Sequence, residues 1–282
     1  MKGYVALILA GASVGLIGPM IKLIDGTIPI MTVSFFRMLI ATLLLLVVLP
    51  FIDREIFKIS RKEMWHYAML GFLIAVNFST YMMAFSLAPI SNVVLLTYTF
   101  PLWLAIFSHY FLKEKVTRFI LFCFALAFIG VAIMNPFQTE YFLGSIIALV
   151  TAFIYAVIYA FMRHIDKRHS IGVVFWFMMF ATIFLSPAPF IFGIGTVGMN
   201  YLWVFVLGIM STAAAYTFLN YGMERIQAEK TSIVTMTTES IIAIALSILF
   251  IGEVLTLNVL FGGILILAAA IFIEHKYGLT KK

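Results

Sequence analysis

One carboxylate at the head of an apolar run is the group in this chain best placed for chemistry. In TTESIIAIALSILF, from Thr237 to Phe250, Glu239 precedes almost continuous apolar sequence, and no Lys or Arg lies within eight residues of it on either side. A charged side chain at the centre of a bilayer costs about 2.5–3.5 kcal/mol on insertion scales. Such a group is tolerated where it faces a wet cavity, pairs with a cation or binds a proton. Glu239 therefore predicts a site inside the membrane.

Three roles for Glu239 follow from this position. The carboxylate can form a fixed ion pair with Lys22 or Arg37, the only basic residues on segments predicted to be buried or on the outer side. It can instead bind a positively charged part of a substrate. It can also take up and release a proton in exchange for substrate. The sequence leaves all three roles open.

Other polar residues recur at helical spacings of three and four, as expected for helix faces that line a cavity. Aromatic side chains with hydroxyls can form a wall against which a planar or partly apolar ligand lies. The alternative is that these hydroxyls and amides hydrogen-bond one helix to another. With Glu239, the residues expected to contact a substrate are Asn77, Tyr81, Tyr98, Tyr155, Tyr159, Tyr216, Asn220, Thr235 and Thr238.

Metal ions and other cofactors are not expected. The chain has one cysteine, Cys123, which cannot form an intramolecular disulfide, and no metal-ligand spacing such as H-E-x-x-H. A Walker-type phosphate loop is also missing from the sequence, so direct drive by ATP is not expected.

Apolar runs of about 20 residues must position these side chains. The chain is 64% hydrophobic and 11% charged, against roughly 25% charged in an average soluble domain. Each run can cross a hydrocarbon core of roughly 30 Å as a helix. The ten runs are 4–24, 30–52, 64–85, 90–112, 117–135, 141–162, 171–192, 201–222, 231–251 and 256–274. The expected fold is an all-α integral membrane domain, residues 1–282, with ten transmembrane helices and no soluble domain.

The basic residues predict the orientation. All but two of the 18 Lys and Arg residues lie at the termini or in links on the same side as the N-terminus; the exceptions are Lys22 and Arg37. By the positive-inside rule, both termini are expected in the cytoplasm, with the protein in the plasma membrane. The net charge of +6 therefore reflects topology, and no nucleic-acid partner is expected.

The chain resembles itself at an offset of 139 residues. The spacing Ser-x2-Phe-x2-Glu-x2-Thr occurs at 108–117 and again at 247–256. We interpret residues 1–138 and 139–282 as two repeats of five helices each, and an odd number of spans requires the second repeat to lie inverted. Inverted repeats are a common plan of secondary transporters, with the substrate site near the midplane.

Three segments carry a resemblance to a known family. They are SFFRMLIATLLLL (34–46), TYTFPLWLAI (97–106) before KEKVT, and TTESIIAIAL before IGEVLT. Together with the two five-helix halves, they resemble the drug/metabolite transporter superfamily, in particular its ten-span EamA-type members, over nearly the whole chain. The resemblance implies an importer or exporter of small metabolites. Members of this family commonly have a proline at the position of Ser240. The chain has a serine there, but the equivalent position of the first repeat is a proline, Pro101.

The expected function is secondary active transport of small organic metabolites, such as amino acids or amines, by alternating access, with proton coupling as one option. A nucleotide-sugar or phosphate-ester exchanger is the alternative, and it would need more deep cations than Arg37 and Lys22 supply. An embedded enzyme would need converging catalytic groups, so no enzymatic activity is expected. The expected partners are a small-molecule substrate and the lipid bilayer. The fifth and tenth runs, 117–135 and 256–274, are expected at the periphery or in a homodimer contact.

Overall fold

The computed structural model describes residues 2–51, 59–112, 118–134, 140–162, 171–226 and 228–277, and every regular element in these ranges is helical. The helices are α1 (Lys2–Gly15), α2 (Ile17–Ile24), α3 (Ile30–Val48), η1 (Leu49–Phe51), α4 (Arg61–Leu87), α5 (Ile90–Thr97), α6 (Phe100–Leu112), α7 (Arg118–Met134), α8 (Phe142–Met162), α9 (Ile171–Leu185), α10 (Ala188–Phe192), α11 (Asn200–Gly208), η3 (Ile209–Ala214), α12 (Ala215–Met223), α13 (Ala228–Leu246), η4 (Ser247–Ile251) and α14 (Leu257–Tyr277). The predicted all-α class is confirmed.

Seven helical segments in the described ranges are long and apolar enough to cross a membrane. They are Lys2–Ile24, Ile30–Phe51, Arg61–Leu87, Phe142–Met162, Gly172–Phe192, Asn200–Met223 and Val234–Ile251. Shorter apolar helices, Ile90–Leu104, Arg118–Met134 and Leu257–Ile273, occupy the other three predicted runs. Ten crossings, and the inversion of the second repeat, remain predictions.

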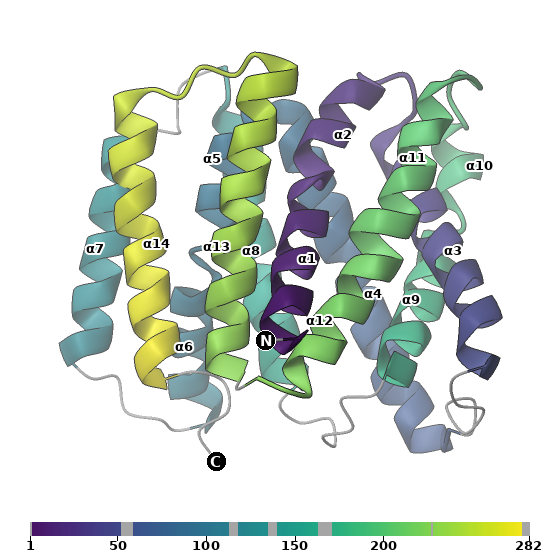
Figure 1. Cartoon of the computed structure of the whole chain (residues 1–282), viewed down its shortest axis with the longest axis horizontal. Helices are drawn as coiled ribbons and strands as arrows, with labels where there is room; N and C mark the ends of the chain where they lie inside the picture. The colour runs from purple at the N-terminus through teal and green to yellow at the C-terminus, as the bar shows by residue number, and fades with distance from the viewer. Residues whose placement is uncertain are drawn as a thin grey trace.

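The helices form one bundle in which both chain termini lie toward the same end (Figure 1). We call this end the inner end. The links between α2 and α3, between α10 and α11, and between η4 and α14 lie at the opposite end, which we call the outer end.

Helices α1 and α13 approach each other closely because α1 carries glycines at the contact. A Cβ on Gly11 would lie 2.5 Å from the Thr235 carbonyl oxygen, and a Cβ on Gly15 would lie 3.0 Å from the Glu239 carbonyl oxygen. Small residues allow helix backbones to come this near in a membrane. The glycines of α1 therefore determine how closely that helix lies against the turn of α13 that carries Glu239.

The two repeats differ where the family resemblance implies a proline. In the first repeat α5 ends at Thr97, and α6 begins at Phe100 with Pro101 in its first turn. In the second repeat α13 continues through Ser240, whose Oγ donates a hydrogen bond to the Met236 carbonyl at 3.0 Å. A proline lacks the N–H that continues a helix and clashes with the preceding turn, so Pro101 explains the break and Ser240 is compatible with the continuous helix.

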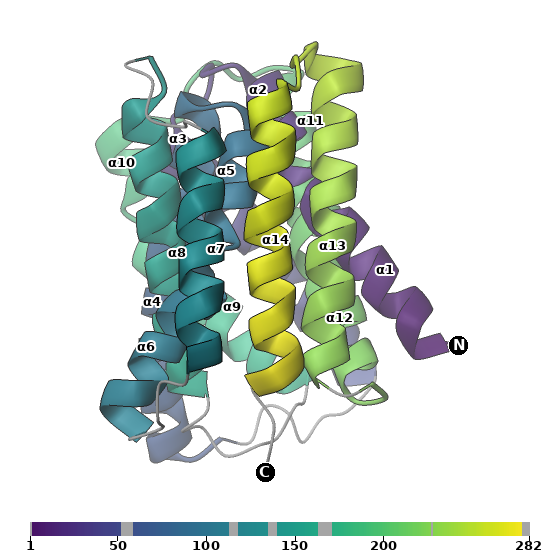
Figure 2. The ribbon, with the colours of Figure 1, turned by 90° about the vertical axis from the view of Figure 1, so that its left-hand side faces the viewer.

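Helices α7 and α14, the fifth and tenth predicted runs, pack on each other at one side of the bundle, as Figures 1 and 2 show. A Cβ on Gly130 of α7 would lie 2.7 Å from the Gly262 carbonyl oxygen of α14. Large apolar side chains such as Phe128 and Phe261 remain exposed on the outward faces of this pair. The peripheral position agrees with the expectation from sequence, and a homodimer contact there remains a prediction.

Candidate functional site

Glu239 lies in the middle of α13, where a tyrosine from the other repeat reaches it. The hydroxyl of Tyr81, on α4, donates a hydrogen bond to Glu239 Oε1 at 3.0 Å. The Tyr81 side chain is buried, packing against Phe85 with ring centroids 4.5 Å apart, whereas Glu239 is only partly buried. The candidate site is therefore built where α4, in the first half of the chain, meets α13, in the second half.

Four tyrosine hydroxyls, from different parts of the bundle, interact electrostatically with the Glu239 carboxylate. They belong to Tyr81 on α4, Tyr98 at the end of α5, Tyr155 on α8 and Tyr216 on α12. The Tyr98 hydroxyl is buried near Glu239 but has no partner with hydrogen-bond geometry among the described residues. Tyr81 thus binds the carboxylate directly, and the buried Tyr98 hydroxyl is a second polar group that a ligand can engage.

Aromatic rings continue the site beyond these hydroxyls. The rings of Phe100, Tyr155 and Tyr159 form a cluster in which each centroid lies 5.1–5.3 Å from the others. The ring of Tyr216 lies 5.5 Å from that of Phe177 and 6.0 Å from that of Phe78. These faces can accept a planar or cationic ligand.

Arg37 and Lys22 do not pair with Glu239 in the described part of the chain. Arg37 is fully buried on α3, where Nε donates to Thr212 Oγ1 at 2.5 Å and Nη2 donates to the Ser211 carbonyl at 3.0 Å. Its guanidinium also lies 4.8 Å from the centroid of the Phe78 ring. Lys22 interacts with Glu253 instead. The structure thus holds no fixed ion pair at Glu239 within these ranges.

The two asparagines of the predicted set contact groups other than Glu239. Asn77 is buried, and its Nδ2 donates to the Thr151 carbonyl at 3.0 Å, which ties α4 to α8. Asn220 lies near the end of α12, where its Nδ2 is 3.4 Å from Glu224 Oε1. Asn77 therefore makes the kind of helix-to-helix contact that was the alternative to ligand binding.

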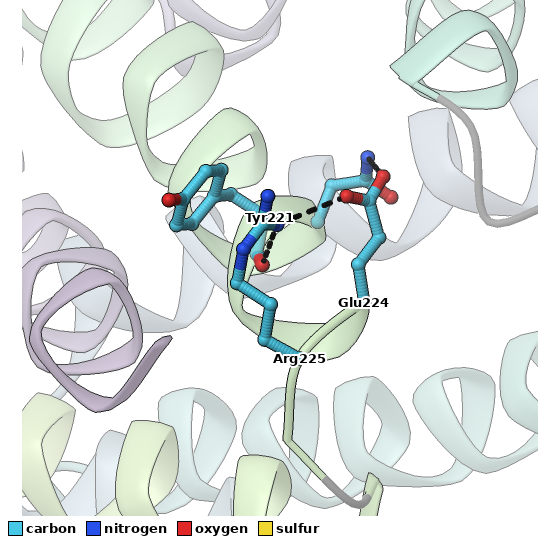
Figure 3. Close-up of polar contacts among 4 residues, drawn as sticks. Tyr221, Glu224 and Arg225 are labelled. Atoms are coloured by element: carbon cyan, nitrogen blue, oxygen red, sulfur yellow. Dashed lines mark hydrogen bonds and ion pairs between the residues drawn. The ribbon is translucent and has the colours of Figure 1, made fainter. Parts of the chain in front are cut away.

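The surroundings of Glu224 form an exposed cluster that is separate from the site (Figure 3). Arg225 Nη1 lies 3.1 Å from Glu224 Oε2 and donates to the Tyr221 carbonyl at 2.9 Å, with the guanidinium over the Tyr221 ring. Both charged side chains are more than 40% exposed. An ion pair this exposed contributes little to stability.

The two threonines of the predicted set lie on the part of α13 that meets α1. A Cβ on Gly11 would lie 2.9 Å from Thr238 Cβ, so Thr238 packs on α1. The Thr235 hydroxyl is buried and has no hydrogen-bond partner among the described residues. The Thr235 hydroxyl therefore lies one helical turn before Glu239 and is available to a ligand there.

Sequence reasoning did not select several residues that shape the site. Phe100 has no polar atom to signal a role, although the offset of 139 residues aligns it with Glu239. Ser211, whose carbonyl accepts a hydrogen bond from Arg37, lies in η3, where the helix widens to a π-type turn. The glycines of α1 were visible in the sequence, but their contact with α13 was not.

The arrangement can bind a cation or a proton. Among the residues that the structure describes, no group of three or more His, Cys, Asp and Glu side chains could hold a metal ion. One carboxylate with hydroxyl donors and aromatic faces is suited to an organic cation, or to reversible protonation.

Known transporters and a solved structure resemble this chain. An uncharacterized transporter of Archaeoglobus fulgidus is 27% identical over 275 residues, 95% of each chain. The pseudopaline exporter CntI of Pseudomonas aeruginosa is 24% identical over 189 residues, 66% of each chain. A crystal structure with 18% identity has the same fold, with a TM-score of 0.65 over 94% of this chain and 95% of its own.

The sequence profile of the EamA-like transporter family matches the chain twice, at residues 1–135 and 142–274. Together with the named relatives, this match identifies a multi-pass membrane transporter and not an enzyme. The resemblance carried by the segments around Pro101 and Glu239 is confirmed. The chain belongs to the EamA-like transporter family.

Proposed function

We propose that this protein is a secondary transporter that moves small organic molecules carrying an amino group across the cytoplasmic membrane by alternating access. The observation that carries the proposal is the Glu239 carboxylate, which accepts a hydrogen bond from Tyr81 but pairs with no cation among the described residues. Both termini are proposed to lie in the cytoplasm, because the links expected on the same side as the termini carry most of the basic residues.

The charge of Glu239 favours a cationic ligand. Removing a carboxylate from water is costly unless an opposite charge or several donors replace the water. Tyr81 supplies one donor, and a bound ammonium group would supply the missing charge. The faces of Phe100 and Tyr155 would add cation–π attraction. A proton can occupy the same carboxylate when substrate is absent, and this exchange is our proposed basis for coupling.

The positions of the two deep basic residues, Arg37 and Lys22, argue against the phosphate-ester alternative. Arg37 is buried and donates to Thr212 and Ser211 through Nε and Nη2, so that among the described residues only Nη1 is left without a hydrogen-bond partner, and Lys22 lies near Glu253. A phosphate group needs several cationic or N–H donors arranged around it. The described part of the site offers hydroxyls and one carboxylate instead.

Alternating access is supported by the origin of the site residues. The first family match contributes Tyr81 and Tyr98, and the second contributes Tyr155, Tyr216 and Glu239. A site shared by two repeats can open to either side when one repeat tilts against the other.

Radiotracer flux into proteoliposomes of the purified protein tests the function. The panel should contain amines, amino acids, nucleobases, organic acids and phosphate esters, each with and without an imposed pH gradient. We expect saturable flux of amino-bearing compounds that responds to the gradient. Saturable flux confined to phosphate esters or to simple organic acids would refute the proposed substrate class.

The Tyr81→Phe variant should reduce uptake at low substrate concentration by about tenfold. The change removes the hydrogen bond to Glu239 but keeps the ring that packs on Phe85, and a hydrogen bond to a charged group contributes about 1.5–3 kcal/mol. Initial rates over a range of substrate concentrations measure the effect. Tyr4→Phe is the matched control, because Tyr4 is exposed on α1 and lies outside the site. Equal kinetics for Tyr81→Phe and the wild type would remove Tyr81 from the site.

A further inference from the structure

Glu253 joins the two repeats at the outer end of the bundle. It lies in the link between η4 and α14, directly after Gly252, which turns the chain with a φ of 72°. Its Oε2 accepts a hydrogen bond from the Ile90 backbone N–H at 2.9 Å, and its Oε1 accepts from the Ser91 N–H at 3.1 Å and from the Ser91 hydroxyl. A carboxylate of the second repeat thus caps the first turn of α5 in the first repeat.

Helix α5 has no cap of its own. The residue before it is Pro89, which makes no side-chain hydrogen bond to the helix. The first N–H groups of a helix are unsatisfied within the helix and carry a partial positive charge. Glu253 satisfies two of them and brings the negative charge that this end favours. Lys22, on α2, adds an electrostatic interaction with the same carboxylate.

A second bridge between the repeats lies at the same end. The Thr27 carbonyl, in the link after α2, accepts a hydrogen bond from the Thr196 N–H at 3.0 Å, and Asn200 Nδ2 donates to Thr27 Oγ1 at 2.7 Å. Thr32 Oγ1 donates to the Gly193 carbonyl at 2.7 Å. Both bridges must separate if the repeats are to part at the outer end.

Helix α5 also leads directly to the candidate site. It is only eight residues long, and the break at Tyr98 and Thr99 separates it from α6. The Tyr98 hydroxyl, at this break, interacts with Glu239. A movement that begins at the Glu253 cap can therefore reach the site through one short, separate helix.

We propose that Glu253 is the releasable latch of an outer gate. In the structure its carboxylate holds the N-terminus of α5. We assign this arrangement to a state closed to the outer side, and Glu253 leaves Ile90 and Ser91 when the Glu239 site opens outward. The inference rests on the proposed alternating-access function. A cap that only stabilises the fold is the competing explanation.

Accessibility of a cysteine below the latch tests the proposal without a known substrate. Val94, one turn into α5, is only 1% exposed. Val94→Cys is introduced in a Cys123→Ala background, since Cys123 is the single native cysteine. Its reaction with a membrane-impermeant maleimide is timed from each side of the membrane. Adding Glu253→Gln, which removes the charge but keeps the shape, should raise the rate from the outer side about fivefold.

Two further variants keep the test decisive. Glu140→Gln makes the same change at another outer carboxylate, which is exposed, and should leave the rate unchanged. If Glu253→Gln does not fold, Ser91→Ala removes one donor to the latch and should give a smaller increase of the same sign. Unchanged labelling in a variant whose melting temperature is normal, or a fall in melting temperature without increased labelling, would overturn the proposal.

The outcome is separable from that of the flux assay. Increased labelling in Glu253→Gln with no flux of amino-bearing compounds would retain the latch and reject the proposed substrate class. Flux of those compounds with unchanged labelling would retain the substrate class and reject the latch.

Discussion

Replacing Glu239 with glutamine is expected to abolish transport, or to uncouple it from the pH gradient, while leaving the amount of folded protein in the membrane unchanged. Glutamine keeps the shape of the side chain and can still accept the hydrogen bond from Tyr81. It cannot attract a cation or exchange a proton. In the proposed complex the carboxylate pairs with the ammonium group of the substrate. Loss of one member of a buried charge pair costs about 3–5 kcal/mol, which corresponds to a fall in apparent affinity of about 100-fold or more.

Flux in proteoliposomes, with reconstituted protein quantified in parallel, measures this effect. Glu140→Gln, the same substitution at an exposed carboxylate, provides the control. Flux that persists but no longer responds to an imposed pH gradient would identify Glu239 as the proton site. Wild-type flux with normal coupling would assign the carboxylate a structural role and contradict the proposed function.

The Gly11→Leu variant is expected to be destabilised, with a lower melting temperature and less folded protein than the wild type. Even a Cβ at this position would lie 2.5 Å from the Thr235 carbonyl oxygen and 3.2 Å from the Glu239 backbone nitrogen. A leucine must therefore push α1 away from α13. Overpacking of this kind costs typically about 1–3 kcal/mol and occasionally more, and for a chain of this size each kcal/mol lowers the melting temperature by roughly 2–4 °C.

A thermal-stability assay in detergent, together with size-exclusion chromatography, measures the loss. Gly198→Leu is the matched control, since no atom lies within 4 Å of a Cβ built there. We expect the control to melt close to the wild type and Gly11→Leu to melt several degrees lower or to aggregate. Equal melting temperatures for the two variants would show that α1 and α13 can separate at this point without cost.

These two positions lie on the same part of α13, so stability and function are connected there. Gly15 of α1 contacts the backbone at Glu239, and Tyr81 of α4 reaches its side chain. Any change that moves α13 away from α1 will also change the distance between Tyr81 and Glu239. Variants of α1 glycines that do fold should therefore be assayed for transport as well as for stability.

The sequence by itself determined the helices and the chemical character of the site. Apolar runs of about 20 residues leave a backbone in lipid little choice but a helix, because each N–H and C=O must be satisfied within the segment. Glu239 also stands out by local pattern, because it lies inside an apolar run with no basic residue within eight positions, whereas Glu140 and Glu253, which are equally far from basic residues, lie between the runs. The helix break near Pro101 and the continuous helix at Ser240 can also be predicted from the sequence, because proline breaks a helix through its own local geometry.

Only the tertiary structure decided which side chains meet. Tyr81 and Glu239 are 158 residues apart, and Asn77, although on the same helix as Tyr81, contacts Thr151 instead. The capping of α5 by Glu253 is equally non-local. Such contacts depend on the rotation and spacing of packed helices, which small residues such as Gly11 set at a few points, and not on the local pattern that makes each segment helical.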